Sequence, residues 1–151
     1  MMNLPGDPQV FIVNDLDRLT LNIEPLLDVL RKSTKRILIV DDDVNLLRSY
    51  ERLLRKSPWQ VVTIPSAQKA LELLQSERFD MVVTDIKMPG IHGFELISQI
   101  RKEDKALPIL ICSGYKSMRD DADLYFYNVA AFLEKPVSMQ VMKDKIAEIL
   151  K

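Results

Sequence analysis

The sequence has few of the residues that build disulfide frameworks or soft-metal sites. Its 151 residues include one cysteine, Cys112, and one histidine, His92. A single cysteine excludes a disulfide within the chain and a thiolate metal cage, and a single histidine excludes a multi-histidine metal site. His92 follows a Pro-Gly turn and has no evident partner, which disfavours a Ser-His-Asp triad. We interpret His92 as a loop residue and Cys112 as a packing residue.

The chain also lacks an excess of charge of either sign. It has 21 Lys and Arg residues against 22 Asp and Glu residues, for a net charge of -1. This balance removes the usual electrostatic basis for binding nucleic acid or an anionic membrane surface. No apolar run approaches the roughly 20 residues that span a bilayer, and the start has no basic and apolar signal-peptide pattern. We therefore expect a cytoplasmic protein without a direct nucleic-acid or membrane partner.

Hydrophobic and charged residues are present in the proportions of a globular domain. They make up 47% and 28% of the chain, respectively. A chain of this length is expected to form one domain that buries roughly 70% of its unfolded surface.

Residues 1–34 are predicted to form a partly helical extension, followed by a domain at 35–151. Apolar side chains in the extension recur at alternating steps of three and four residues, as in an amphipathic helix: Leu16, Leu19, Ile23, Leu26 and Leu30. Pro25 interrupts the pattern, so the helix kinks there or a second helix begins. Two interpretations of the apolar stripe remain open: packing on the main domain, or contact with a second copy or a partner.

From residue 35 onward, apolar runs alternate with helical patterns. The expected strands are 37–40, 60–64, 79–84, 109–112 and 129–133. The expected helices are 46–54, 67–74, 94–100, 116–123 and 137–150. Because continuous apolar strands are buried on both faces and parallel strands need crossover helices, this order predicts an α/β fold. The expected architecture is a doubly wound, flavodoxin-like sheet of five parallel strands with helices on both faces.

Chemically useful residues follow the predicted strands at their carboxyl ends. Asp41 to Asp43 follow the first strand, Asp85 the third, Ser113 the fourth, and Lys135 the fifth. Carboxylates that converge repel one another unless a cation joins them, and all-oxygen ligands favour Mg²⁺ or Mn²⁺. A metal, a hydroxyl and an ammonium could together hold the oxygens of a phosphoryl group, and a carboxylate there could act as a nucleophile.

Four motifs at these strand ends closely resemble the receiver domain of two-component response regulators. They are ILIVDDD at 37–43, VVTDIKMPGIHGFELI at 82–97, ILICSGY at 109–115 and FLEKPV at 132–137. The resemblance extends over about 35–151. We expect a stand-alone receiver, because no output domain follows, unless the chain is a fragment of a longer protein.

The resemblance implies a phosphoacceptor and a metal site. Asp85 corresponds to the aspartate that is phosphorylated. Asp42 corresponds to a direct metal ligand, and Asp41 to one that acts mostly through water. Asp85 and the backbone carbonyl of Lys87 complete the implied site for Mg²⁺ or Mn²⁺.

The resemblance also implies a switch. Ser113 corresponds to the switch hydroxyl, Lys135 to the lysine that pairs with the phosphoryl group, and Phe132 to the aromatic switch position. The Lys135–Pro136 bond is usually cis in the family. The switch would remodel the face made by the predicted helix 116–123, the strand 129–133 and the helix 137–150.

Three further residues depart from the family pattern or lie outside it. Asp43 has no family role and is interpreted as a helix N-cap. Asn128 stands where many relatives have glycine, and asparagine tolerates a left-handed turn. Tyr115 is bulky enough to shield an acyl phosphate, so we expect slow self-dephosphorylation.

The implied partners are a sensor histidine kinase or phosphotransfer protein and a downstream protein target. A homodimer through the extension or the switch face is a further possibility. Two other functions remain open. A haloacid-dehalogenase-type phosphatase would share the fold and the Asp-x-Asp motif, which 41–43 satisfies. That family usually has Thr or Val at the position of Asn45, however. A receiver-like adaptor would work without phosphorylation.

Overall fold

The computed structural model describes residues 23, 25–27, 34–88, 90, 93–114 and 127–151. The chain divides into two compact units, Met1–Thr34 and Lys35–Lys151. In the first unit residues 23 and 25–27 are helical, and Ile23 and Leu26 expose 45% and 57% of their surface. Leu16, Leu19 and Leu30 of the predicted stripe lie outside the described residues, so the role of the extension stays a prediction.

The second unit contains one sheet and the helices that connect its strands. Its elements are β1 (Arg36–Val40), α2 (Val44–Leu54), β2 (Gln60–Ile64), α3 (Ala67–Ser76), β3 (Met81–Thr84), α4 (Gly93–Glu103), β4 (Ile109–Ser113), β5 (Ala131–Glu134) and α6 (Met139–Ile149). The strand order is β2-β1-β3-β4-β5, and every neighbouring pair is parallel. The predicted doubly wound, five-stranded fold is confirmed. The helix predicted at 116–123 lies outside the described residues.

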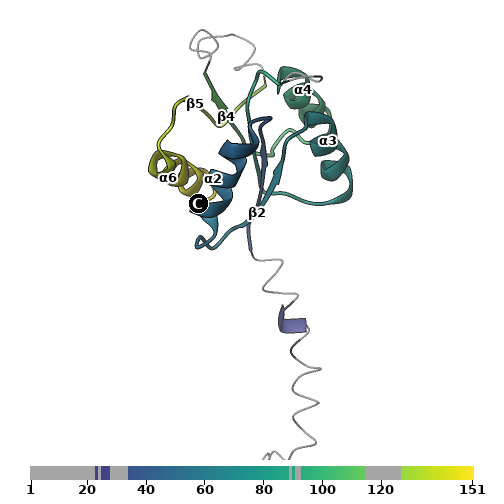
Figure 1. Ribbon diagram of the computed structural model, residues 1–151. Coiled ribbons are helices and arrows are strands. Elements are labelled where there is room, and N and C mark those ends of the chain that lie inside the picture. Colours follow the sequence, from purple (N-terminus) through teal and green to yellow (C-terminus); the bar gives the residue numbers. More distant parts are fainter. Residues whose placement is uncertain (1–22, 24, 28–33, 89, 91–92, 115–126) are drawn as a thin grey trace, which may run out of the picture. The chain divides into compact units, whose positions relative to one another are not determined.

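Two hydrophobic layers hold the helices on the sheet. Helices α3 and α4 cover one face, and α2 and α6 cover the other (Figure 1). In β1, Leu38 and Val40 face the first layer, while Ile37 and Ile39 face the second. Because both faces are buried, the strand needs an apolar residue at every position, which explains its unbroken apolar run.

Side-chain caps begin three of the helices. Asp43, Ser66 and Ser138 each accept a hydrogen bond from the backbone N–H three residues later, at the start of α2, α3 and α6. Such caps satisfy an otherwise unpaired helix N–H. The interpretation of Asp43 as an N-cap is confirmed.

The predicted bounds of β3 and β5 differ from those observed. β3 begins at Met81 rather than at residue 79, because Phe79 turns into the core with its ring under the Arg36 guanidinium, 4.5 Å from the centroid. β5 begins two residues later than predicted, because Asn128 takes the left-handed conformation expected of it (φ 54°) and pairing starts at Ala131. The apolar pattern alone therefore predicted the starts of β3 and β5 two residues too early.

Among the described residues, no helix combines the length and the apolar character needed to traverse a bilayer. Cys112 is buried in β4, 3.7 Å from the Tyr50 hydroxyl, as its packing interpretation requires. His92 and Tyr115 lie outside the described residues.

Candidate functional site

Two neighbouring strands of the sheet end in buried acids. Asp41 directly follows β1 and Asp85 directly follows β3, and the Asp85 N–H donates to the carbonyl of Val40 (3.2 Å). Asp42 is exposed beside them. One carboxylate oxygen from each of these three acids lies within 4.8 Å of the others. The structure therefore brings Asp41, Asp42 and Asp85 together at the carboxyl edge, where their side chains could share one cation.

A lysine that follows the edge strand β5 bridges two of the acids. The Nζ of Lys135 donates to Asp41 Oδ2 at 2.7 Å and to Asp85 Oδ2 at 2.8 Å. Lys135 is held there because its N–H donates to the carbonyl of Ser113 (2.8 Å). The following bond to Pro136 is cis, as the resemblance implied.

The charges at this edge do not balance. Three carboxylates face one ammonium group, which leaves a formal charge of about -2. Burial raises the pKa of Asp41, although the hydrogen bond from Lys135 opposes that rise. Burial would lower the pKa of Lys135, but its hydrogen bonds to Asp41 and Asp85 outweigh burial and raise it. The ammonium is therefore firmly protonated, and the cluster retains excess negative charge.

The loop after β3 fixes the orientation of Asp85. Its Oδ1 accepts hydrogen bonds from the N–H groups of Ile86 (2.6 Å) and Lys87 (3.3 Å). The Thr84 hydroxyl donates to the Asp85 carbonyl (2.9 Å). With Oδ1 held by the backbone, Oδ2 is the oxygen that accepts the hydrogen bond from Lys135 (2.8 Å).

Gly93 is a site-building residue that the sequence reasoning missed. Its N–H donates to the carbonyl of Ile86 at 2.7 Å. A Cβ at this position would lie 2.2 Å from the Asp85 carbonyl oxygen and 2.5 Å from the Ile86 Cα, so only glycine lets the start of α4 approach the loop so closely. The signal was a second glycine three residues after Gly90, at the start of a helix.

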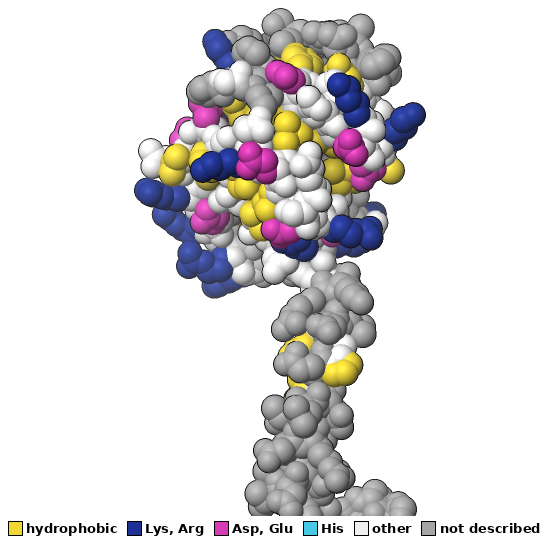
Figure 2. Space-filling model, turned by 90° about the vertical axis from the view of Figure 1, so that its right-hand side faces the viewer, with side chains coloured by type: hydrophobic (Ala, Val, Ile, Leu, Met, Phe, Trp, Pro, Cys, Tyr) yellow, Lys and Arg dark blue, Asp and Glu magenta, His cyan; other side chains and the backbone are white. Residues whose placement is uncertain are grey.

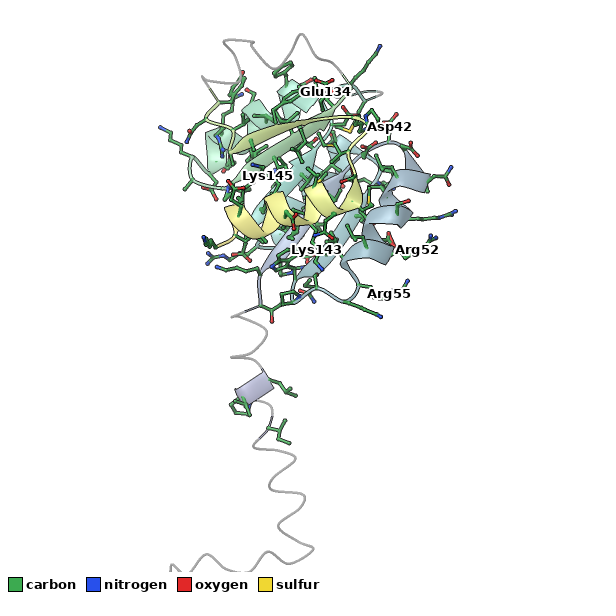
Figure 3. The ribbon with its side chains drawn as sticks, turned by 90° about the vertical axis from the view of Figure 1, so that its left-hand side faces the viewer. Asp42, Arg52, Arg55, Glu134, Lys143 and Lys145 are labelled. Carbon is green, nitrogen blue, oxygen red and sulfur yellow. The ribbon has the colours of Figure 1, made fainter. Side chains whose placement is uncertain are left out.

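The two predicted switch residues, Ser113 and Phe132, lie on the adjacent strands β4 and β5. Ser113 is fully buried at the end of β4 and is paired with Glu134 of β5. Phe132 is half-buried and packs against the hydrophobic layer under α3 and α4. Asp42 and Glu134 lie at one end of the domain in Figure 3, and Arg55 lies at the other.

The donor set fits a hard divalent cation. All three ligand groups are carboxylates, the residual charge is close to -2, and one of the acids is exposed enough to leave room for water. Mg²⁺ and Mn²⁺ prefer such oxygen ligands and usually keep several waters. The N–H of Lys87 is engaged with Asp85, and its carbonyl remains a predicted ligand.

Comparisons with known proteins identify the family of the domain. A family model described as the response regulator receiver domain matches residues 37–147. The two-component response regulator ARR12 of Arabidopsis thaliana is 35% identical over 111 residues, which is 72% of this chain and 18% of that protein. The transcriptional regulatory protein GlrR of Escherichia coli (strain K12) is 31% identical over 114 residues, which is 76% of this chain and 26% of that protein. The chain thus spans about a fifth to a quarter of the length of these relatives.

Two solved structures are similar over most of the domain. A CheY-like response regulator receiver domain protein from Methanospirillum hungatei JF-1 has a TM-score of 0.74 and 31% identity, covering 78% of this chain and 94% of that one. The response regulator protein TrrA from Thermotoga maritima, solved in complex with Mg²⁺-BeF, has a TM-score of 0.71 and 30% identity, covering 78% of this chain and all of that one.

Proposed function

The chain belongs to the response regulator receiver domain family, and on that premise we propose that Asp85 accepts a phosphoryl group from a phosphohistidine on a sensor kinase or phosphotransfer protein. Receiver domains are phosphorylated on an aspartate in two-component signalling and are signalling domains rather than general enzymes. The observation that carries the proposal is the cluster of the Asp41, Asp42 and Asp85 carboxylates, two of which Lys135 bridges.

The transfer exchanges one bond to phosphorus for another. Oδ2 of Asp85 attacks the phosphorus in line, the bond from phosphorus to the donor histidine nitrogen breaks, and that nitrogen keeps the electron pair. Oδ1 stays fixed by the N–H groups of Ile86 and Lys87, which holds the nucleophile in one orientation. The ammonium of Lys135, already 2.8 Å from Oδ2, pairs with the incoming phosphoryl oxygens.

We assign the divalent site to Asp41, Asp42, Asp85 and the backbone carbonyl of Lys87. Mg²⁺ bound there would neutralise negative charge on the phosphoryl oxygens during transfer. Support comes from the three clustered carboxylates and from the Mg²⁺-BeF complex of the similar Thermotoga protein.

We propose that the signal leaves through the face made by the segment 116–123, β5 and α6. The Ser113 hydroxyl would bond the phosphoryl group, and Phe132 would fill the space that Ser113 vacates. One charged hydrogen bond supplies roughly 1.5–3 kcal/mol, whereas a switch from 1:99 to 99:1 needs about 5.5 kcal/mol. Lys135 and the metal must therefore contribute to the shift as well.

The family match favours this function over a haloacid-dehalogenase-type phosphatase, which gives no role to the Asp85 motif. The intact cluster likewise favours it over a phosphorylation-independent adaptor. Turnover of a generic phosphate ester separates the two chemistries, because a phosphatase cycles while a receiver is modified once and decays. The proposal places the domain in the cytoplasm, and its output passes to a protein target or to a second copy of the chain.

Beryllofluoride with Mg²⁺, a stable mimic of the aspartyl phosphate, tests the proposal. We expect beryllofluoride to change the NMR chemical shifts of amides around Asp85 and also those along β5 and α6. Ser113→Ala should keep the shifts near Asp85 and weaken those on β5 and α6. Beryllofluoride binding that persists in Asp85→Ala would contradict the proposed site. Binding to the wild type that leaves the amide signals of β5 and α6 unchanged would contradict the proposed switch. Size-exclusion chromatography of the same samples reports on dimer formation.

A further inference from the structure

A groove between α3 and α4 has no part in the phosphorylation chemistry. Its volume is about 620 Å³, and the two helices and the loops at their C-terminal ends line it. These C-terminal ends lead into β3 and β4, so the groove extends toward the amino edge of the sheet. Asp85 lies at the opposite, carboxyl edge. A ligand in the groove would therefore not meet the proposed phosphorylation site.

The inner wall of the groove is apolar. Leu71 and Leu74 of α3 are half-buried there, and Ile100 and Leu107 lie behind them in the core. Figure 2 looks at the side that α3 and α4 cover, and apolar side chains are visible between acidic ones in the middle of this face. An apolar wall of this kind can bury one or two aliphatic side chains of a partner.

The rim of the groove is acidic. Five of the lining residues are Asp or Glu, against one basic residue, Arg78. Glu77 is paired with Arg36 (2.7 Å), but Glu72, Glu95 and Glu103 have no hydrogen-bond or ion-pair partner in the part of the chain that the structure describes. The groove thus presents three uncompensated carboxylates around an apolar wall, on a chain whose overall charge is only -1.

We propose that this groove docks a basic, amphipathic peptide segment of a protein partner. Charge complementarity sets the sign of the segment, and the wall made by Leu71 and Leu74 requires apolar side chains between its Lys or Arg residues. The volume suits a few side chains and not a whole domain, so the occupant is one turn or two of a helix or a short extended stretch. The proposal goes beyond phosphorylation, because it gives the domain an attachment point that is present in either state.

The test uses the full 151-residue chain and a defined probe. The probe is a fluorescein-labelled amphipathic helical peptide made of Leu and Lys, compared with the same peptide carrying Glu in place of Lys. Fluorescence anisotropy at about 0.15 M salt measures affinity, because this ionic strength screens diffuse attraction beyond roughly 8 Å. We expect the Lys peptide to bind and the Glu peptide not to bind.

A triple variant and a matched control separate the groove from general acidity. The triple variant carries Glu72→Gln, Glu95→Gln and Glu103→Gln. It should weaken binding of the Lys peptide about threefold or more, because three exposed charge pairs are lost together. The control removes three exposed acids from the other layer, with Glu51→Gln, Asp144→Asn and Glu148→Gln, and changes the net charge equally. The control should bind within about twofold of the wild type. An unchanged amide spectrum of each variant shows that the fold is intact.

Three results would overturn the proposal. The first is an equal loss in both triple variants. The second is a set of peptide-induced amide shifts on α2 and α6 instead of α3 and α4. The third is full displacement of the peptide by spermidine at equal charge, which would assign the groove to small cations. Beryllofluoride should leave the affinity unchanged, so failure of the phosphorylation proposal would not affect this result.

Discussion

Strand β1 carries a charged residue at each of its ends, and the two ends differ in how those charges are compensated. At the amino end, every arm of the Arg36 guanidinium has a partner. Nε donates to Gln60 (2.8 Å), Nη1 to the carbonyl of Arg78 (2.8 Å) and Nη2 to Glu77 (2.7 Å), while the Phe79 ring lies against the group. Each nitrogen of the guanidinium therefore has an acceptor, and its charge is paired with Glu77.

At the carboxyl end, five residues later, the charges are left out of balance. Asp41 and Asp85 share the single ammonium of Lys135, and Asp42 adds a third carboxylate beside them. Burial raises the pKa of Asp41. A folded chain tolerates such an arrangement when another cation completes it or when function requires it. The paired charges at the amino end stabilise the fold, whereas the excess negative charge at the carboxyl end is the feature that the proposed cation site requires.

Removal of each central cation should show the difference most strongly. Lys135→Met removes the cation that two buried carboxylates share and should cost about 3 kcal/mol of unfolding free energy in EDTA. Arg36→Met breaks a half-exposed network and should cost about 1 kcal/mol. Urea unfolding measures both. Millimolar Mg²⁺ should recover stability in Lys135→Met and leave Arg36→Met unchanged; equal costs with no response to Mg²⁺ would remove the distinction between the two ends.

The close packing behind the acids should also be sensitive. Gly93→Ala places a methyl group 2.2 Å from the Asp85 carbonyl and should cost about 1–3 kcal/mol through backbone displacement. Gly114→Ala is the matched control, because a Cβ there has nothing within 4 Å. Thermal unfolding checks the pair. A Gly93→Ala variant as stable as Gly114→Ala would show that the loop after β3 is not confined.

Metal affinity should distinguish two adjacent acids that look alike in the sequence. Asp42→Asn removes a carboxylate from the cluster and should weaken Mg²⁺ binding at least about tenfold. Asp43→Asn, which alters the N-cap of α2 through its bond to Leu46, should bind Mg²⁺ within about twofold of the wild type. Calorimetric titration of Mg²⁺ gives both constants, and a reversed order of the two effects would reassign the site.

The smallest expected effect is a change in the free energy of unfolding with pH. Because the pKa of Asp41 is raised above its usual 3.8, the folded state binds this proton more tightly than the unfolded state. Its contribution to metal-free stability should therefore fall as the pH rises from about 4 through the raised pKa. The pKa of Lys135 is raised as well, but Lys135 adds no pH dependence in this acidic range. Its stabilising effect is complete at every pH below the usual lysine pKa of 10.5.

The difference in stability between wild type and Asp41→Asn isolates this effect. In EDTA the difference should shift in favour of the variant as the pH rises, and Mg²⁺ should reverse the shift. If the difference in stability between the two proteins does not change with pH, the pKa of Asp41 is not raised by folding.

The sequence was sufficient to predict the fold and most of the acids for local reasons. An apolar strand that ends in Asp41 or Asp85 places the acid at the carboxyl edge of a parallel sheet, and a cap such as Asp43 follows from its position before a helix. Strand starts were less predictable, because the start of β5 depends on pairing with Leu110 and not on its own residues.

Two features of the site depend on contacts that no local pattern contains. Lys135 lies 94 residues from Asp41 and 50 from Asp85, so its double bridge is visible only in the folded chain. Gly93 is required by backbone atoms of the loop that it touches, and a glycine at a helix start has other common explanations.

The most direct test of the central claim locates the phosphoryl group itself. The chain is treated with phosphoramidate and Mg²⁺, the acyl phosphate is reduced with borohydride, and peptides are sequenced by mass spectrometry. The account predicts homoserine at position 85 and unmodified aspartate at positions 41, 42 and 43. Homoserine at any of those three positions, or an acid-stable phosphate elsewhere with residue 85 intact, would contradict it.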